Sequence, residues 1–337
     1  MNKIINNTFG RFKDSDVILT SLFGGNNTCI SIMNWGASIQ NWTINNSANS
    51  SNSVVLGFEN FDYYPKYSPY FGSIIGRTIN RINRGRFSLN EKKYQLDINR
   101  PPNHLHGGET GFGKLIWDFE INQQDNSVSY FIQSKDGEGG YPGNVKANVK
   151  YQLDDQKLKI EIRANTDCET PINMGQHNYF NLSSTQERPY NICNHYLYLN
   201  SSKFTETNQH LIPTGKILPT LGTEMDFSIS KEIGEIELDD NFILNKAVVN
   251  SELSAKLYNP NNGLTLNLWT DQPGIQVYNS PKLDIKVPGL NNITYNNFSG
   301  ICLEAQKFPD SVNHNHFPPI IVSPNNPYFH KTEIEIL

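Results

Sequence analysis

Two side chains far apart along this chain have the chemistry of a general base and a general acid. Glu304 lies in Ile301–Gln306, whose alternation as a strand would place it on the face opposite Leu303. His177 lies in Asn173–Leu182, which we also interpret as a strand. Glutamates are most often solvated, and a lone histidine is most often a satisfied core residue. The meaning of this pair therefore depends on what the rest of the chain supplies.

Several other polar side chains could hold a hydroxylated ligand. Amide, carboxylate, imidazole and guanidinium groups offer the donors and acceptors that hydroxyls require. Four arginines within one short segment favour at least one buried or ligand-facing guanidinium. The candidates are Asn80 and the arginines Arg77, Arg81, Arg84 and Arg86 in segment 75–87, His106 in Asn103–Gly108, Asp239 in Asp239–Phe242, and Gln276 with Tyr278 in Pro273–Asn279.

Two histidine pairs resemble metal ligands by spacing. They are His104 with His106 and His314 with His316. A structural or catalytic zinc site needs three or four ligands, and no cysteine or carboxylate is suitably placed beside either pair. We therefore predict no metal.

One glycine-rich stretch resembles part of a phosphate-binding loop. Gly108–Lys114 matches the first part of that motif, but Leu115 follows where Ser or Thr should ligate magnesium. The residues after it favour a strand, so no helix N-terminus would receive a phosphate. We therefore reject a nucleotide site.

Composition excludes several classes of partner. The 337 residues carry a net charge of −5 with no run of Lys or Arg, which argues against nucleic acid or an anionic membrane. Met1–Asn7 has no apolar signal-peptide region, and no apolar run reaches membrane-spanning length. The four cysteines are widely spaced, as in a reducing compartment. We predict a soluble, cytoplasmic monomer.

The elements that position these residues are short strands. Alternating runs at 29–42, 114–121, 127–133, 144–153 and 158–164, together with a buried run at 54–58, are separated by turn-forming residues. Long patterns of helical period are nearly absent. Residues 45–53 form an Asn/Ser-rich stretch that we predict to be an exposed loop, without assigning it a function. No repeat or linker is visible, so we predict an all-β chain with one domain spanning residues 1–337.

The ordered set of motifs resembles one family, aldose 1-epimerase, also called galactose mutarotase. Each motif is weak alone, but together they cover most of the chain from about residue 70 to beyond residue 320. The matching motifs are Asn80-Arg81-Ile82 with Gly85 and Phe87, Leu105-His106-Gly107-Gly108 with Gly111-Phe112 and Trp117, Gly140-Tyr141-Pro142-Gly143, His177-Asn178-Tyr179-Phe180-Asn181-Leu182, Asp239-Asp240-Asn241-Phe242, Pro273-Gly274-Ile275-Gln276-Val277-Tyr278, and Leu303-Glu304-Ala305-Gln306 with Pro309-Asp310 and Asn313.

The resemblance implies a large antiparallel β-sandwich, a galactose mutarotase-like supersandwich with few short helices. Its concave face would hold a monosaccharide such as galactose or glucose, and no cofactor would be needed. By motif, Glu304 would be the general base and His177 the general acid, flanking one pyranose from opposite sides. The substrate-binding residues would be Asn80, Arg81, His106, Asp239 and Gln276.

Two positions depart from the family pattern. Gln176 stands where the family usually has Asn, and Asp240 stands where it usually has His. Neither position is assigned to proton transfer, but Asp240 adds negative charge beside Asp239.

The residue types suit interconversion of the α and β anomers of a hexose. A glutamate with an ordinary pKa of about 4.3 can accept the proton of the C1 hydroxyl, and a histidine near about 6.5 can protonate the ring oxygen. The alternatives are a glycoside hydrolase that uses Glu304 and Asp239, a non-catalytic carbohydrate-binding protein, and a hexose-6-phosphate 1-epimerase with extra cations at the rim, for which Arg77, Arg84 and Arg86 are candidates.

Overall fold

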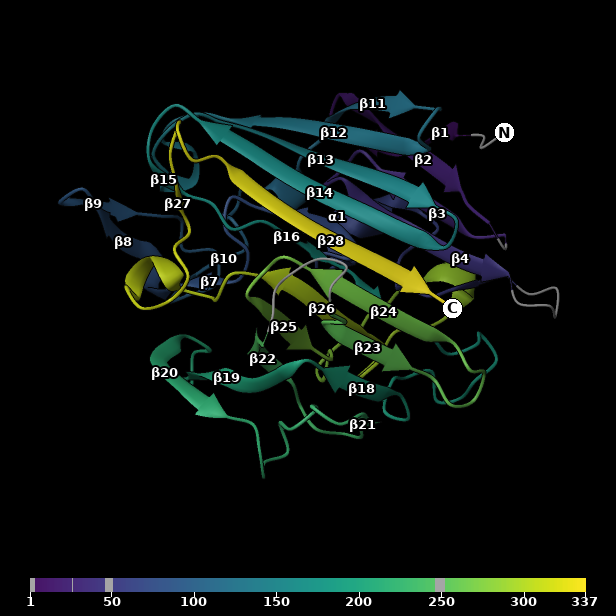
Figure 1. The fold of residues 1–337 in the computed structure, drawn as a ribbon. Helices are drawn as coiled ribbons and strands as arrows, with labels where there is room; N and C mark the ends of the chain where they lie inside the picture. The colour runs from purple at the N-terminus through teal and green to yellow at the C-terminus, as the bar shows by residue number, and fades with distance from the viewer. Residues whose placement is uncertain (1–3, 26, 46–50, 246–251) are drawn as a thin grey trace.

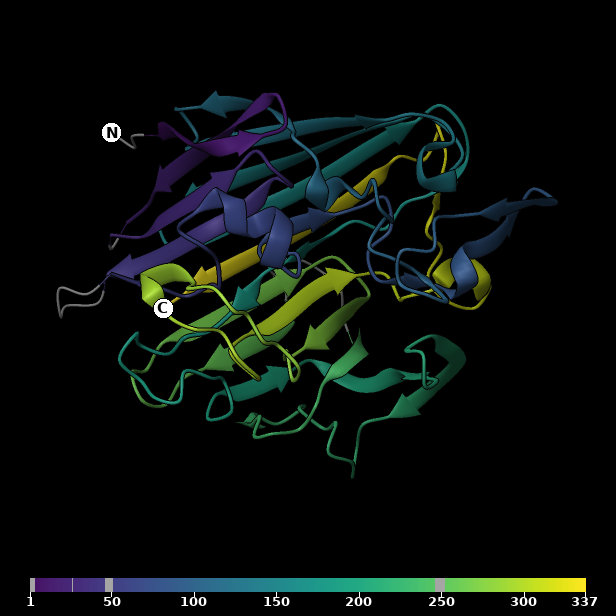
Figure 2. The same cartoon turned by 180° about the vertical axis from the view of Figure 1, so that it is seen from behind.

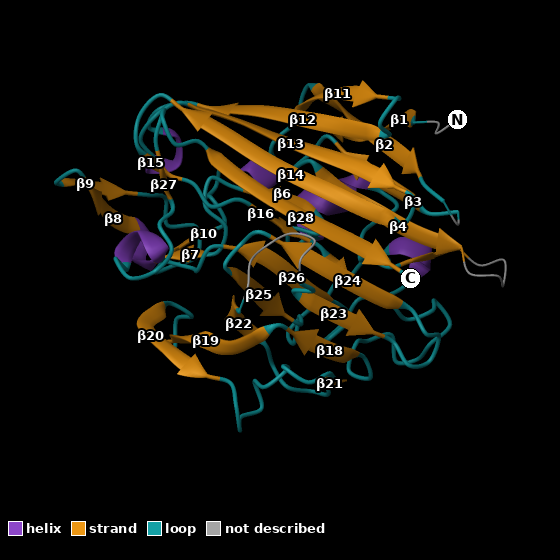
Figure 3. Ribbon diagram, in the orientation of Figure 1, coloured by secondary structure: helices purple, strands orange, loops and turns teal. Residues whose placement is uncertain are grey.

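The architecture is that of a layered β-protein in the computed structural model, which describes residues 4–25, 27–45, 51–245 and 252–337. Strands cross the molecule in stacked sheets and helical segments are few and short (Figure 3). All pairings between named strands in the described ranges are antiparallel. The all-β sandwich expected from the sequence is therefore confirmed.

The largest sheet has nine strands and runs across the front of Figure 1. Its strands alternate buried and more exposed residues, as in β14, because one face packs on the core and the other faces solvent. In sheet order the strands are β11 (Asp118–Asn122), β12 (Ser127–Ser134), β13 (Val145–Asp154), β14 (Lys157–Thr166), β28 (Tyr328–Ile336), β24 (Thr265–Thr270), β23 (Ala255–Tyr258), β18 (Tyr196–Leu199) and β21 (Lys231–Glu232).

A six-stranded sheet carries most of the chemistry-bearing strands. Its order is β17 (Tyr179–Phe180), β26 (Ile301–Gln306), β25 (Gly274–Tyr278), β22 (Asp239–Leu244), β19 (Ser201–Thr207) and β20 (Pro213–Pro219). All six residues of β26 are buried, so both faces of this strand are covered. The register pairs Asn241 with Gln276 and Gln276 with Glu304, which places these three polar side chains on one face.

The N-terminal sheet has five strands, and Figure 2 shows it from behind in purple. Its strands are β1 (Ile5–Phe12), β2 (Ser15–Phe23), β3 (Cys29–Met33), β4 (Ser38–Asn45) and β5 (Ser51–Ser53). Smaller pairs are β6 (Ser73–Ile75) with β16 (Gly175–His177), β7 (Arg81–Ile82) with β10 (His104–Leu105), β8 (Arg86–Leu89) with β9 (Lys92–Gln95), and β15 (Thr170–Pro171) with β27 (Ile321–Val322).

Helical segments in the described ranges are single turns. They are α1 (Tyr64–Tyr67) and the 3-10 turns η1 (Phe61–Tyr63), η2 (Asn83–Gly85), η3 (Phe112–Lys114), η4 (Glu138–Gly140), η5 (Leu290–Asn292) and η6 (Ser311–Asn313). No helix in the described part of the chain is long and apolar enough to cross a membrane.

Two strand predictions and one loop prediction differ from the structure. The run at 114–121 forms a strand only from Asp118, after the turn η3. At 54–58 only Val55 makes a β-bridge, because the N–H groups of Val54 and Leu56 bond to two different segments, at Trp42 and Tyr179, and no continuous ladder forms. The stretch 45–53 ends in β5, which pairs with β4, whereas residues 46–50 lie outside the described ranges.

Candidate active site

A cleft of about 600 Å³ opens beside the six-stranded sheet. Its volume falls within the range usual for small-molecule sites, about 300–1,000 Å³. It is lined by Pro69, Tyr70, Asn80, Arg81, Arg100, Leu105, His106, His177, Tyr179, Leu211, Glu237, Leu238, Asp239, Asp240, Tyr278, Pro281, Lys282 and Glu304. Segments from distant parts of the sequence thus converge on one concave surface.

The structure brings the expected acid and base into direct contact. His177 Nε2 lies 3.4 Å from Glu304 Oε1, and the two side chains are only 6 % and 3 % exposed. A pyranose cannot fit between atoms this close, so the expected arrangement on opposite sides of one sugar is wrong. Both groups belong to the same wall of the cleft, where they can meet two neighbouring oxygens of one ligand.

The imidazole of His177 is fixed by contacts on its edges and its face. Its Nδ1 lies 3.5 Å from Cys302 Sγ, and the ring of Tyr179 stacks on it with centroids 5.1 Å apart. His177, Cys302 and Glu304 form the one group of potential metal ligands found in the described ranges. The thiol and the carboxylate face opposite ring nitrogens, however, and one ion cannot bind both edges of an imidazole.

Burial shifts the pKa values of the pair in opposite directions. It raises the pKa of Glu304 well above its ordinary value; the negative charge of Asp239 acts the same way and Arg81 opposes it. It lowers the pKa of His177 to about 4. The ordinary values assumed from sequence are therefore wrong in this environment. Both shifts disfavour the charged form, so the favoured state of the pair carries one proton, on Glu304, beside a neutral His177.

Arg81, Asp239 and Gln276 form a chain of polar contacts beside this pair. The Arg81 guanidinium lies 3.9 Å from Asp239 Oδ2, and Gln276 Nε2 donates to Asp239 Oδ1 at 2.8 Å. Burial raises the pKa of Asp239, while Arg81 and the hydrogen bond from Gln276 lower it. Arg81 and Asp239 line the cleft, whereas Gln276 lies behind Asp239 and does not. Gln276 can therefore orient a ligand-binding carboxylate without itself lining the cleft.

Asn80 and His106 are held in mutual contact. Asn80 donates its N–H to His106 Nδ1 at 3.2 Å, and its side-chain oxygen accepts the N–H of Arg81 at 2.8 Å. Burial and the neighbouring His177 and Arg81 lower the pKa of His106 well below its ordinary value. An imidazole that is neutral and accepts at Nδ1 carries its proton on Nε2. His106 is thus a neutral hydrogen-bond donor in the wall of the cleft.

Gly107 lets the backbone next to His106 pass close to the backbone of Gly76. Gly107 has φ +81°, and a Cβ there would overlap the carbonyl of Gly76. Only glycine adopts such a conformation without strain at this close approach.

The two departures from the family pattern lie in different places. Gln176 points away from the cleft and donates to the hydroxyl of Tyr151 at 3.3 Å. Asp240 lines the cleft, and its Oδ2 accepts the N–H of Asp239 at 3.2 Å. Burial, with the charge of Asp239, raises the pKa of Asp240 to about 6. The extra carboxyl therefore lies close to a ligand, as its position in the sequence suggested.

None of the three rim arginines considered from sequence lines the main cleft. Arg77 is buried and donates to Ser134 and to two backbone carbonyls, so its guanidinium is structural. Sequence reasoning instead missed Arg100 and Lys282, which come from loops without a local motif. Tyr70, from the loop before β6, also lines the cleft.

His104 and His316, one member of each histidine pair, bond to other protein groups. His104 is buried, with Nδ1 at 2.8 Å from the carbonyl of Asp97 and Nε2 at 2.7 Å from the hydroxyl of Tyr141. It is therefore a fully bonded core histidine, separate from His106. The nitrogen His316 Nε2 bonds to the carbonyl of Gly215 at 2.8 Å.

Comparisons with known proteins identify the family of this chain and agree with its fold. The family model described as aldose 1-epimerase matches residues 19–335. The galactose mutarotase of Mus musculus is 39 % identical over 310 residues, covering 90 % of this chain and 89 % of that protein. The aldose 1-epimerase of Escherichia coli (strain K12) is 30 % identical over 322 residues, covering 91 % and 92 %. The crystal structure of galactose 1-epimerase from Lactobacillus acidophilus NCFM has a TM-score of 0.86 and 24 % identity, covering 100 % and 99 %.

Proposed function

The chain belongs to the aldose 1-epimerase family, and from that premise we propose how its cleft interconverts the α and β anomers of free hexoses. Galactose and glucose are the substrates we assign to it. Glu304 is the general base and His177 the general acid. Asn80, Arg81, His106, Asp239 and Gln276 bind or orient the sugar.

The proposed reaction needs one proton to enter and one to leave at neighbouring atoms. The carboxylate of Glu304 accepts the proton of the C1 hydroxyl as the bond between C1 and the ring oxygen breaks, and His177 gives a proton to that ring oxygen. The open aldehyde rotates about the C1–C2 bond, and reclosure reverses both transfers. Acid and base are regenerated, so no cofactor is consumed.

The contact between His177 and Glu304 carries this proposal. The C1 hydroxyl oxygen and the ring oxygen are both bonded to C1, so an acid and a base only 3.4 Å apart can reach both. Transfer of the shared proton from Glu304 to His177 across this contact gives the carboxylate that accepts a proton and the imidazolium that donates one. The positive charge of Arg81 favours the carboxylate form of Glu304, and the Nε2–H of His106 can stabilise negative charge on a sugar oxygen.

The alternatives explain less of this arrangement. A binding protein has no need for a buried acid in contact with a buried base. The glycoside hydrolase considered from sequence uses Asp239 as its second carboxyl, yet Asp239 is engaged by Arg81 and Gln276. A phosphorylated hexose would need cations at the rim. Arg100 and Lys282 are present there, but Lys282 already lies 3.6 Å from Glu237.

The setting in the cell is also part of the proposal. Four free cysteines are typical of a reducing compartment, so we assign the enzyme to the cytoplasm. We expect it to act as a monomer on a small sugar, without nucleic acid.

Polarimetry of freshly dissolved α-galactose and α-glucose tests the function. We expect the wild-type protein to accelerate the approach to the equilibrium rotation severalfold or more over buffer at micromolar concentration. A rate equal to that of buffer for both sugars, from protein shown to be folded by circular dichroism, would overturn the proposal.

A further inference from the structure

One motif of this chain has no part in the reaction as described. Pro309-Asp310 and Asn313 follow strand β26, which carries Glu304, yet neither Asp310 nor Asn313 lines the cleft. Asp310 is only 4 % exposed and has φ +54°, a conformation that is uncommon for any residue except glycine, asparagine and aspartate. A buried carboxyl on such a backbone requires a structural reason.

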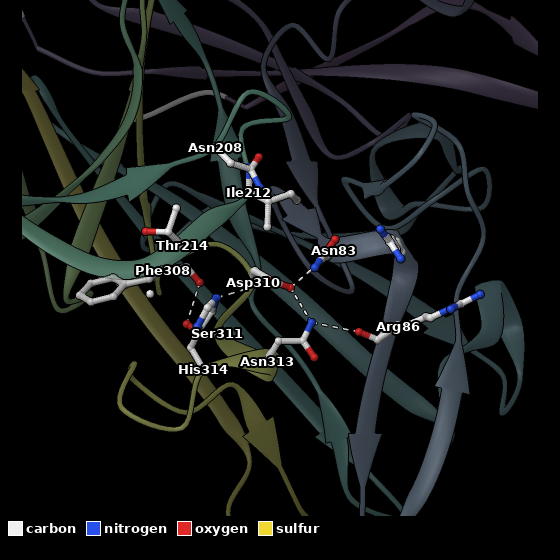
Figure 4. Close-up of polar contacts among 12 residues, drawn as sticks. Asn83, Arg86, Asn208, Ile212, Thr214, Phe308, Asp310, Ser311, Asn313 and His314 are labelled. Atoms are coloured by element: carbon white, nitrogen blue, oxygen red, sulfur yellow. Dashed lines mark hydrogen bonds and ion pairs between the residues drawn. The ribbon is translucent and has the colours of Figure 1, made fainter.

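Figure 4 shows the side chain of Asp310 in contact with Asn83 and Asn313. The N–H of Asp310 donates to the carbonyl of Arg81 at 3.1 Å, and Asp310 Oδ1 accepts the N–H of Asn83 at 3.0 Å. The same oxygen accepts from Asn313 Nδ2 at 2.7 Å, and Asn313 Nδ2 also donates to the carbonyl of Arg86 at 2.9 Å. One aspartate therefore holds both ends of the short segment from Arg81 to Asn83.

We propose that Asp310 is a positioning residue that fixes Arg81 relative to Glu304. The inference rests on the proposed function, in which Arg81 contacts the sugar. Asp310 lies six residues after Glu304, just beyond the end of the same strand. It thereby joins the strand that carries the base to the segment that carries the guanidinium.

Small displacements of this guanidinium matter for the reaction. The tip of Arg81 lies 3.9 Å from Asp239, and its side chain is 15 % exposed in the cleft. Binding groups work only within a narrow range of positions, and a shift of about 1 Å can cost about 10²-fold in rate. Loss of the Asp310 side chain releases the N–H of Asn83, and the segment that carries Arg81 is then free to shift.

Two substitutions separate the hydrogen bonds from the backbone conformation. Asp310→Asn keeps an oxygen at Oδ1 and tolerates positive φ, so we expect kcat/KM within about threefold of wild type. Asp310→Gly also tolerates positive φ but removes the acceptor. For Asp310→Gly we expect a rise in the KM for galactose of about tenfold or more, with a smaller fall in kcat, because a misplaced Arg81 binds sugar poorly.

Asn126 provides a matched control on the nine-stranded sheet. It is 2 % exposed, has φ +49°, and its Nδ2 donates to the carbonyls of Phe23 and Leu153 at 3.0 and 2.8 Å. Asn126→Gly should lower thermal stability to an extent similar to Asp310→Gly while leaving the KM for galactose unchanged. Sugar binding then responds to the particular contact rather than to stability in general.

A double-mutant cycle with Arg81→Ala tests whether Asp310 acts through Arg81. If it does, Asp310→Gly lowers kcat/KM by more than about tenfold in the wild-type background and less than about twofold in the Arg81→Ala background. Equal losses in both backgrounds, or Asp310→Asn as impaired as Asp310→Gly, would overturn the inference. Both outcomes require an active wild-type enzyme, so they are distinct from a failure of the proposed function.

Discussion

The nine-stranded and six-stranded sheets differ in how their strands bury side chains. In β14 of the larger sheet, the inward residues Leu158, Ile160 and Ile162 are buried and alternate with more exposed neighbours. In β26 of the smaller sheet every residue is buried, including Glu304 and Gln306. Burial of polar groups is unfavourable unless they gain partners. Buried polar side chains also occur in the larger sheet, as at Glu333, so the chemistry is located where such side chains border the cleft, as Glu304 does.

The same contrast is seen between two buried histidines, His177 at the cleft and His195 beside the nine-stranded sheet. Burial lowers the pKa of both His177 and His195 to about 4. His195 lies next to the nine-stranded sheet, where its Nε2 accepts the N–H of Leu182 at 3.1 Å and its Nδ1 bonds to the neighbouring Asn194. His177 instead turns Nε2 toward Glu304 in the cleft. A shifted pKa alone therefore does not identify a catalytic residue; access and partners do.

The largest expected effect comes from replacing the base. Glu304→Gln should lower kcat for mutarotation by about 10³–10⁴-fold, because an amide cannot accept the proton of the C1 hydroxyl. Polarimetry measures the rate, and circular dichroism checks the fold. Glu333→Gln is the matched control, since Glu333 is also buried, with Lys331 Nζ at 3.1 Å, but belongs to the nine-stranded sheet. Comparable losses in both variants would remove the distinction between the sheets.

A truncation in the larger sheet should act on stability alone. Leu158 is fully buried, so Leu158→Ala should lower the free energy of unfolding by about 2–5 kcal/mol through lost burial and a residual cavity. Urea denaturation measures this change, and kcat/KM of the folded enzyme should stay within about twofold. The neighbouring Lys159→Ala, on the outward face, should change stability by less than about 1 kcal/mol. A large fall in kcat/KM for Leu158→Ala would show that the nine-stranded sheet also shapes the cleft.

The fully buried His195 should make the free energy of unfolding depend on pH. The pKa of His195 is about 4 when folded and about 6.5 when unfolded, so the unfolded state binds more protons between these values. Stability is therefore lost as pH falls from about 6.5 toward 4. Between pH 7 and 5 the wild type should lose about 2 kcal/mol more than His195→Gln, whose amide oxygen can still accept the N–H of Leu182. Equal losses in urea titrations at the two pH values would contradict this assignment.

The smallest effect is expected on activity in the same pH range. His177 has a pKa of about 4, so the one-proton pair gains its second proton only near that pH. We expect kcat/KM to change by less than about twofold between pH 7 and 5. Initial rates in buffers of equal ionic strength measure this, with folding checked at each pH. An acidic limb near pH 6.5 would show that His177 titrates like an exposed histidine.

Sequence patterns predicted the larger sheet more closely than the smaller elements around it. The strands expected at 144–153 and 158–164 appear as Val145–Asp154 and Lys157–Thr166, because alternation alone determines which face is buried. The strand expected at 54–58 is absent because its N–H groups bond to two different segments rather than to one partner strand, which no local pattern reveals. The start of the strand near 118 is set by Trp117, which donates to the carbonyls of Phe112 and Asn34.

The site was predictable in part. Motifs identified the residues that line the cleft from strands, such as Asp239 and Glu304, since their neighbours are characteristic. They could not reveal the 3.4 Å contact between His177 and Glu304, the position of Gln276 behind Asp239, or the opposite pKa shifts. These properties depend on packing between segments remote in sequence, and on the solvent that packing excludes.

The central claim is that His177 and Glu304 act as one proton-transfer unit, and a double-mutant cycle tests it most directly. Polarimetry of α-galactose should give kcat for Glu304→Gln, His177→Asn and the double variant. Residues that act as a unit are strongly non-additive, so the double variant should be within about tenfold of the slower single variant. Losses that multiply, with each single variant slow and the double slower by the product, would contradict the claim.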